Sequence, residues 1–165
     1  MAHTKLGPNP ANTVGELPSA NSSAPAFVLT ANDMKDVSLK DFAGKNVVLN
    51  IFPSVDTGVC ANSVREFNKR AASMDNTVIL CISKDLPFAQ KRFCGAEGID
   101  KAITLSDFRS RGFGKAYGVE LVDSGFAGLF ARAVVVIDPA GKVKHTELVP
   151  QIGEDPNYEA ALKAI

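Results

Sequence analysis

The sequence predicts an α/β protein in which a central mixed sheet is flanked by helices. Three observations favour this fold class. Continuous apolar runs at VVLNIF, TVILCIS and AVVVID are typical of strands that are covered on both faces. Amphipathic stretches follow the first two runs, which indicates parallel pairing there. The segment PAGK joins AVVVID to KVKHTELV and predicts an antiparallel hairpin.

The N-terminal region is predicted to be an extension of this sheet protein. Residues Thr4 to Glu16 contain GPNPAN, a turn-rich centre between short extended pieces, which predicts a small β-hairpin. LPSANSSAP is a loop, AFVLT a short strand, and VSLKDFAGK a turn or single helical turn that ends at Gly44. We therefore expect one domain over 1–165, with the hairpin and loop occupying 1–25.

The helices are placed by periodicity and by residues that start and stop them. After the strand at 47–52, apolar residues at helical spacing predict a helix from about Cys60 to Met74. After the strand at 77–83, Asp85 and the following Pro87 predict a helix start, and Gly95 predicts its stop.

The remaining elements complete the order. A short strand is expected at 103–105 and a short helix at 108–117, and PNYEAALKAI predicts a terminal amphipathic helix. Strand–helix–strand–helix, followed by a hairpin and a last helix, is the order of the thioredoxin-like fold, here with an N-terminal β-hairpin extension.

Composition excludes several classes of partner. The 165 residues carry 18 basic and 18 acidic side chains with no Lys/Arg-rich run, so neither a nucleic-acid nor a membrane-surface partner is expected. No stretch approaches the ~18 consecutive apolar residues of a membrane span, and the N-terminus lacks the apolar core of a secretory signal. Three cysteines in such a chain indicate a reducing compartment, so we expect a cytoplasmic protein.

The chemically distinctive stretch is FPSVDTGVC, which ends at Cys60. This thiol follows the carboxyl end of a predicted strand, where reactive groups gather in open α/β sheets, and it lies in the first turn of a helix, whose dipole favours a thiolate. Taken singly, Cys60 is compatible with a small buried residue, Thr57 with a helix cap and Pro53 with a strand end. Together they form P-x-x-x-T-x-x-C, which is a specific pattern.

This pattern resembles the active-site motif of peroxiredoxins. Together with LCISKDLPFAQKRFCGAEG and LFARAVVVID, it makes the chain similar to the bacterial thiol peroxidase subfamily of atypical two-cysteine peroxiredoxins, from about Phe27 to the C-terminus. The resemblance implies a thioredoxin fold, antioxidant peroxide reduction without metal or prosthetic group, thioredoxin as the reductant, and a homodimer.

The resemblance also implies roles for five residues. Cys60 would attack the peroxide and become a sulfenic acid. Thr57 and nearby backbone amides would bind the peroxide oxygens, and Pro53 would shield the sulfenic acid. Arg132 matches the active-site arginine of the family. Cys94 would be the resolving thiol, which condenses with oxidised Cys60 into an intramolecular disulfide.

Position along the predicted helices adds a prediction of motion. Cys94 lies at the end of its helix, ~12–15 Å from the active-site edge if the helices run parallel. A disulfide needs Cα atoms within ~7 Å, so Cys60 and Cys94 should not bond until a helix end unwinds. Cys94 is also compatible with a helix C-terminal residue that packs on the sheet. Cys81, in the middle of TVILCIS, is predicted to lie in the core.

Other functions fit less well or stay open. A thioredoxin-type exchanger would have C-x-x-C, and a cysteine phosphatase would have C-x5-R, whereas Cys60 to Arg65 is C-x4-R. A cysteine peptidase or a zinc or haem site would need histidine, and His3 and His145 are placed as surface residues. A redox-sensing binding protein that uses the same Cys60–Cys94 switch remains open.

A hydrophobic cluster precedes Arg132 in the sequence. It consists of Phe113, Phe126, Leu129 and Phe130. These residues are compatible with ordinary core, and the preference of the family for organic hydroperoxides suggests that some of them line an apolar mouth for alkyl or lipid chains.

Overall fold

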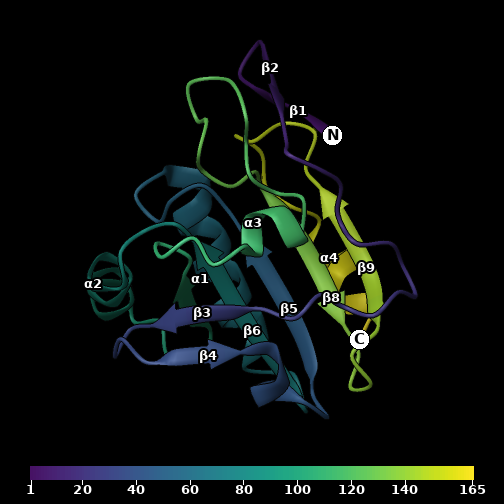
Figure 1. The fold of residues 1–165 in the computed structure, drawn as a ribbon. Helices are drawn as coiled ribbons and strands as arrows, with labels where there is room; N and C mark the ends of the chain where they lie inside the picture. Colours follow the sequence, from purple (N-terminus) through teal and green to yellow (C-terminus); the bar gives the residue numbers. More distant parts are fainter.

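The computed structural model describes residues 1–165 and contains a seven-stranded mixed sheet. In the order in which they lie side by side, its strands are β4 (Asp36–Ser38), β3 (Val28–Ala31), β7 (Ile103–Ser106), β6 (Thr77–Ser83), β5 (Asn46–Ile51), β8 (Ala133–Ile137) and β9 (Val143–Leu148). The pairs β5–β6 and β6–β7 are parallel, and all other neighbours are antiparallel. The predicted thioredoxin-like mixed sheet is confirmed (Figure 1).

Helices cover both faces of this sheet. One face packs against α1 (Gly58–Ala71), α2 (Pro87–Glu97) and α4 (Tyr158–Lys163), and the other against α3 (Phe113–Ala116) and its neighbouring loops. Figure 1 shows α3 in front of the sheet and α1 behind it. Every residue of β5 from Val47 to Ile51 is buried, which explains its continuous apolar run. No helix is long and apolar enough to cross a membrane.

The N-terminal hairpin forms as predicted. Strands β1 (His3–Leu6) and β2 (Asn9–Asn12) pair antiparallel in a separate two-stranded sheet. Figure 1 shows the hairpin beyond the end of the main sheet to which the arrow of β9 points. The short 3-10 helix η1 (Leu39–Phe42) is the single helical turn expected before Gly44.

The boundaries of α2 differ from the prediction. Leu86, not Asp85, is its N-cap, because the Asp85 side chain is bonded elsewhere. The helix passes through Gly95, where a side chain would meet no neighbouring atoms, and ends at Glu97 with Gly98 as its C-cap. Gly98 has a φ of 65°, the left-handed conformation that commonly terminates helices and that glycine adopts without strain.

Two further helices are shorter than predicted. The helix expected over 108–117 is confined to Phe113–Ala116, because Ser110 and Gly112 before it have φ values of 52° and 92°, which a helix cannot include. The helix at Cys60 ends at Ala71 rather than Met74.

Candidate active site

Cys60 lies in the first turn of α1, directly behind the carboxyl end of β5. Thr57 is the N-cap of this helix, and Cys60 is its third residue and fully buried. Two hydrogen bonds fix this turn against the sheet: Ser63 Oγ donates to the Cys60 carbonyl at 2.7 Å, and Asn50 Nδ2 of β5 donates to Ser63 Oγ at 3.1 Å. The thiol is therefore held at a helix N-terminus, where the dipole and free N–H groups favour negative charge.

Arg132 makes the direct side-chain contact with this thiol. In the antiparallel register of β5 and β8, Ile51 lies opposite Ala133, so Arg132 is placed at the end of β5 where the active-site loop begins. Arg132 Nη2 donates to Cys60 Sγ at 3.0 Å, and Arg132 Nε donates to the Ile152 carbonyl at 2.7 Å. Arg132 Nη1 is buried and has no hydrogen-bond partner.

The burial of this arginine has an electrostatic consequence. Arg132 is 1% exposed, and its hydrogen bonds go to a carbonyl and a sulfur, none to a carboxylate. A permanent positive charge is costly in the interior unless a negative charge compensates it. Cys60 Sγ is the contacting group that would supply that charge as a thiolate.

A cavity of about 230 Å³ opens beside Arg132, and Cys60, which is fully buried, does not itself line it. Three residues of the predicted site, Pro53, Thr57 and Arg132, line it together. The remaining lining residues are Leu6, Gly58, Val59, Phe126, Ile152 and Gly153. Thr57 Oγ1 donates to the Ser54 carbonyl at 3.0 Å, which leaves its lone pairs free to accept a hydrogen bond from a group bound in the cavity.

Cys94 lies elsewhere. It is half-buried in α2, its Sγ is 3.5 Å from Thr104 Oγ1 of β7, and it faces a separate cavity of about 330 Å³. Strands β7 and β8 are three strand spacings apart in the sheet, about 14 Å, so Thr104 and Arg132 belong to distant parts of it. All three cysteines are free. The structure therefore does not bring Cys94 into the cavity beside Cys60.

Comparisons with known proteins show the family of this chain. The family profile described as Redoxin matches residues 19–162. The chain is 59% identical over 165 residues to the thiol peroxidase of Mycobacterium tuberculosis. The aligned region covers 100% of this chain and 99% of that protein. The chain belongs to the thiol peroxidase family of the peroxiredoxins. It is therefore a peroxidase, an oxidoreductase of the peroxiredoxin type.

Solved structures support the same assignment. A peroxiredoxin-like protein from Aquifex aeolicus superposes with a TM-score of 0.93 at 37% identity, covering 99% of this chain and 96% of that chain. A thiol peroxidase from Chromobacterium violaceum superposes with a TM-score of 0.91 at 22% identity, covering 99% and 95%, which shows the shared fold.

The third thiol of this thiol peroxidase homologue is a core residue, as predicted. Cys81 is fully buried in β6, and Asn50 Nδ2 donates to its sulfur at 3.6 Å. Burial raises the pKa of Cys81 to about 12, so it stays a thiol at neutral pH.

The four hydrophobic residues near Arg132 divide between two places. Phe126 lines the cavity beside Cys60. Phe113 and Phe130 pack against each other in the core on the opposite face of the sheet, with ring centroids 5.6 Å apart. Leu129 is half-buried and does not line the cavity. The expectation of an apolar mouth therefore applies to Phe126 alone, because the other two rings fill the sheet face that α1 does not cover.

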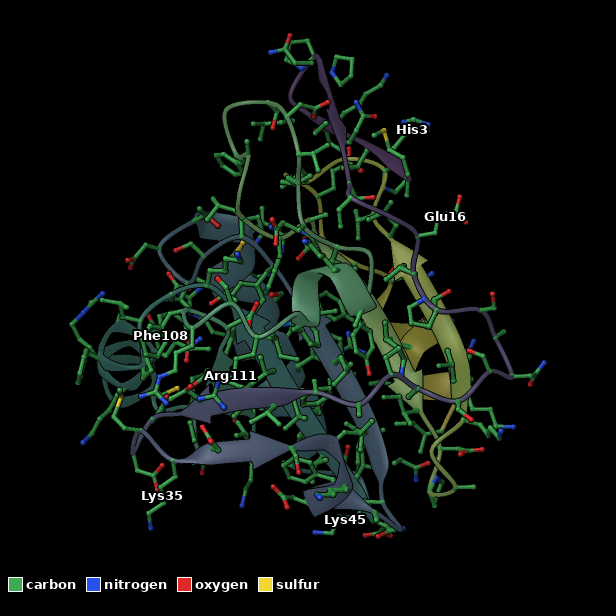
Figure 2. The ribbon with its side chains drawn as sticks, in the orientation of Figure 1. His3, Glu16, Lys35, Lys45, Phe108 and Arg111 are labelled. Carbon is green, nitrogen blue, oxygen red and sulfur yellow. The ribbon has the colours of Figure 1, made fainter.

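Neither histidine is placed to act as a base for the Cys60 thiol. His3 lies on the N-terminal hairpin, where Figure 2 labels it, and its Nδ1 is 2.5 Å from Asn12 Oδ1. His145 lies in β9, and neither ring hydrogen-bonds to Cys60. No three His, Cys, Asp or Glu side chains gather in a geometry that could hold a metal ion.

Sequence reasoning missed Asp85 as a residue of this site. Its carboxylate accepts hydrogen bonds from Ser54 Oγ at 2.7 Å, from the Val55 N–H at 2.9 Å and from Ser83 Oγ at 2.6 Å. Asp85 thereby ties the loop that carries Pro53 and Thr57 to the end of β6. Its position at the carboxyl end of a strand beside β5 was the available signal, but a helix-capping role was the simpler interpretation.

Proposed function

We propose that this peroxidase reduces hydrogen peroxide and organic hydroperoxides with Cys60 as its peroxidatic nucleophile. The observation that carries the proposal is the 3.0 Å contact from Arg132 Nη2 to Cys60 Sγ beside a cavity that Pro53 and Thr57 also line. Such an arrangement combines a charge-stabilised thiolate with a place for a small substrate.

The chemistry follows from the groups that surround the sulfur. The Cys60 thiolate attacks one peroxide oxygen, the O–O bond breaks, and the sulfur becomes a sulfenic acid. The second oxygen leaves as water or as an alcohol after taking up from solvent one proton, the equivalent of the one that the Cys60 thiol released when it became the thiolate. Arg132 Nη1, which has no partner, and the free N–H groups at the start of α1 donate hydrogen bonds to the oxygens as charge develops on them.

The composition of the cavity suits organic as well as inorganic peroxides. Leu6, Val59, Phe126 and Ile152 supply an apolar lining beside the polar groups of Thr57 and Arg132. An alkyl chain would pack against these side chains while its hydroperoxide group meets the sulfur.

Recycling requires the second cysteine. Cys94 attacks the sulfenic acid, water leaves, and a Cys60–Cys94 disulfide forms, which thioredoxin then reduces to two thiols by thiol–disulfide exchange. Because Cys94 contacts Thr104 and faces another cavity, the C-terminal part of α2 must move first. We expect this cycle to serve antioxidant defence in the cytoplasm, in a homodimer.

The test is a peroxidase assay with thioredoxin and thioredoxin reductase on wild type, Cys60→Ser, Cys94→Ser and Cys81→Ser. Cys60→Ser should be inactive with hydrogen peroxide and with cumene hydroperoxide. Cys94→Ser should consume one equivalent of peroxide and then stop, whereas Cys81→Ser should turn over. Disulfide formation in the wild type without turnover by thioredoxin would instead indicate a redox sensor, and activity in Cys60→Ser would refute the proposal.

A further inference from the structure

We propose that the N-terminal hairpin positions the guanidinium of Arg132, through Thr4 and Gln151 as positioning residues. This inference rests on the proposed role of Arg132 at Cys60. The connection runs through residues 149–153, which follow β9 and lie between the hairpin and the active site. These residues form no helix or strand, so no regular hydrogen-bond ladder fixes them.

Residues 149–153 bind Arg132 both at its main chain and at its guanidinium. The Val149 N–H donates to the main-chain carbonyl of Arg132 at 3.0 Å. The Ile152 carbonyl accepts from Arg132 Nε at 2.7 Å. A guanidinium is planar, so once Nε is fixed by Ile152 and Nη2 reaches Cys60 Sγ, the direction of Nη1 is fixed too. The position of the Ile152 carbonyl therefore determines the direction of Arg132 Nη1, the donor that we assign to the peroxide.

The hairpin in turn holds residues 149–153. Thr4 Oγ1, in a residue that is 4% exposed, donates to the Val149 carbonyl at 2.7 Å. The Ile152 N–H donates to the Lys5 carbonyl at 2.9 Å. At the turn, the Gly7 N–H donates to Gln151 Oε1 and Gln151 Nε2 donates to the Gly7 carbonyl, both at 3.0 Å.

These bonds form a continuous path from the hairpin to the sulfur. Lys5 fixes the amide of Ile152, the carbonyl of the same residue fixes Arg132, and Arg132 reaches Cys60. Figure 1 shows the hairpin at the end of the molecule to which β9 leads, next to the chain that continues from that strand. A loosened hairpin would leave the fold of the sheet intact but release the carbonyl that orients the guanidinium.

A hairpin that only stabilises the fold would not affect Cys60 through Arg132 in particular. Substitutions of individual side chains can separate this case from the positioning role. Thr4→Val removes the bond to residue 149 with little change of volume, and Thr4→Ser keeps the hydroxyl. Thr13→Val is the matched control: Thr13 is fully buried in the same N-terminal segment, its Oγ1 donates to the Gly15 carbonyl at 2.6 Å and accepts from the Ala2 N–H at 3.1 Å, and it has no hydrogen bond to residues 149–153. Gln151→Ala is a second variant, at a half-buried side chain.

The measurement is the second-order rate constant of Cys60 oxidation by hydrogen peroxide in a single turnover without thioredoxin, from pH 5 to 9, on protein shown to be folded by circular dichroism. We expect Thr4→Val to lower this rate constant about threefold to tenfold, the effect of losing one buried hydrogen bond, and to move its pH profile to higher pH. Gln151→Ala should act in the same direction, and Thr4→Ser and Thr13→Val should stay within twofold of wild type.

Two results would overturn the inference: a wild-type rate and pH profile in Thr4→Val, or an equal loss in Thr13→Val. If Thr4→Val does not fold, the same comparison between Gln151→Ala and Thr13→Val decides. Failure of the proposed function would look different, because the Cys60 thiol of the wild type would then react with hydrogen peroxide no faster than free cysteine.

Discussion

Arg132 Nη2 lies 3.0 Å from Cys60 Sγ, and both residues are almost completely shielded from solvent. A charged hydrogen bond in such a place is stronger than one at the surface, because water cannot screen it. Removing either partner leaves the other without compensation. The reactivity of the thiol should therefore depend steeply on the identity of residue 132.

Arg132→Met should lower the rate constant of Cys60 oxidation by hydrogen peroxide by about 100-fold or more, since removing one preorganised donor to developing charge costs about 100-fold to 1000-fold in rate. Arg132→Lys should recover only part of this loss, because an ammonium cannot reach both Ile152 and the sulfur as the forked guanidinium does. Stopped-flow oxidation measures both rates. A lysine variant within threefold of wild type would mean that a point charge suffices and that the fork geometry is irrelevant.

Asp85→Ala should loosen the loop between β5 and α1 and lower both stability and peroxidase activity. Three hydrogen bonds to this carboxylate would be lost, and with them about 2–3 kcal/mol of unfolding free energy. Asp85→Asn, which keeps one acceptor oxygen, should lie between wild type and Asp85→Ala. Urea unfolding and steady-state kinetics on the three proteins measure this order. Equal activity in all of them would show that the loop keeps its shape without the carboxylate.

The C-terminal part of α2 should resist the opening that disulfide formation needs. Arg65 of α1 forms a two-pronged ion pair with Glu97, Nε to Oε2 at 2.9 Å and Nη2 to Oε1 at 3.0 Å, and the guanidinium holds the pKa of Glu97 below its usual range. Cys94 also donates its S–H to Thr104 Oγ1, because the Thr104 hydroxyl proton is already donated to Asn32 Oδ1 at 2.9 Å. Both contacts must break before Cys94 can reach Cys60.

Glu97→Gln and Thr104→Val should therefore speed the conversion of the sulfenic acid to the Cys60–Cys94 disulfide, each by about twofold to fivefold, as expected for weak contacts. They should also make the protein less prone to over-oxidation at high peroxide, because the sulfenic acid is captured sooner. Rapid quenching with mass spectrometry follows both products. The difference between Glu97→Gln and wild type should shrink at 1 M salt, whereas that of Thr104→Val should not. A slower conversion in either variant would contradict this account.

The sequence predicts those features of the fold and the site that are encoded by neighbouring residues. The strand–helix order follows from continuous apolar runs and helical spacing, and Pro53, Thr57 and Cys60 lie within one short motif. Arg132 is 72 residues from Cys60, and only the family resemblance pointed to it. The Ile152 carbonyl has no side-chain signature at all, because every residue offers one. Its role depends on how a segment without regular structure is held by the hairpin.

The buried thiol of Cys81 should make stability depend on pH in the alkaline range. Its pKa is about 12 in the folded protein, against 9.0 for an ordinary thiol, so between these values the folded state holds a proton that the unfolded state has lost. The contribution of Cys81 to stability is therefore complete below about pH 9 and falls by up to about 1.4 kcal/mol for each pH unit above it.

This dependence can be isolated in a Cys60→Ser/Cys94→Ser background, in which Cys81 is the sole thiol. Urea unfolding would be compared with and without Cys81→Ala between pH 7 and 10.5. Below pH 9 the alanine variant should be less stable by a constant amount, about 1–2 kcal/mol for the lost buried sulfur. Above pH 9 the gap should close, because only the protein with Cys81 must keep its thiol protonated in order to fold. A gap that stays constant up to pH 10.5 would mean that Cys81 ionises as easily in the folded protein as in the unfolded chain.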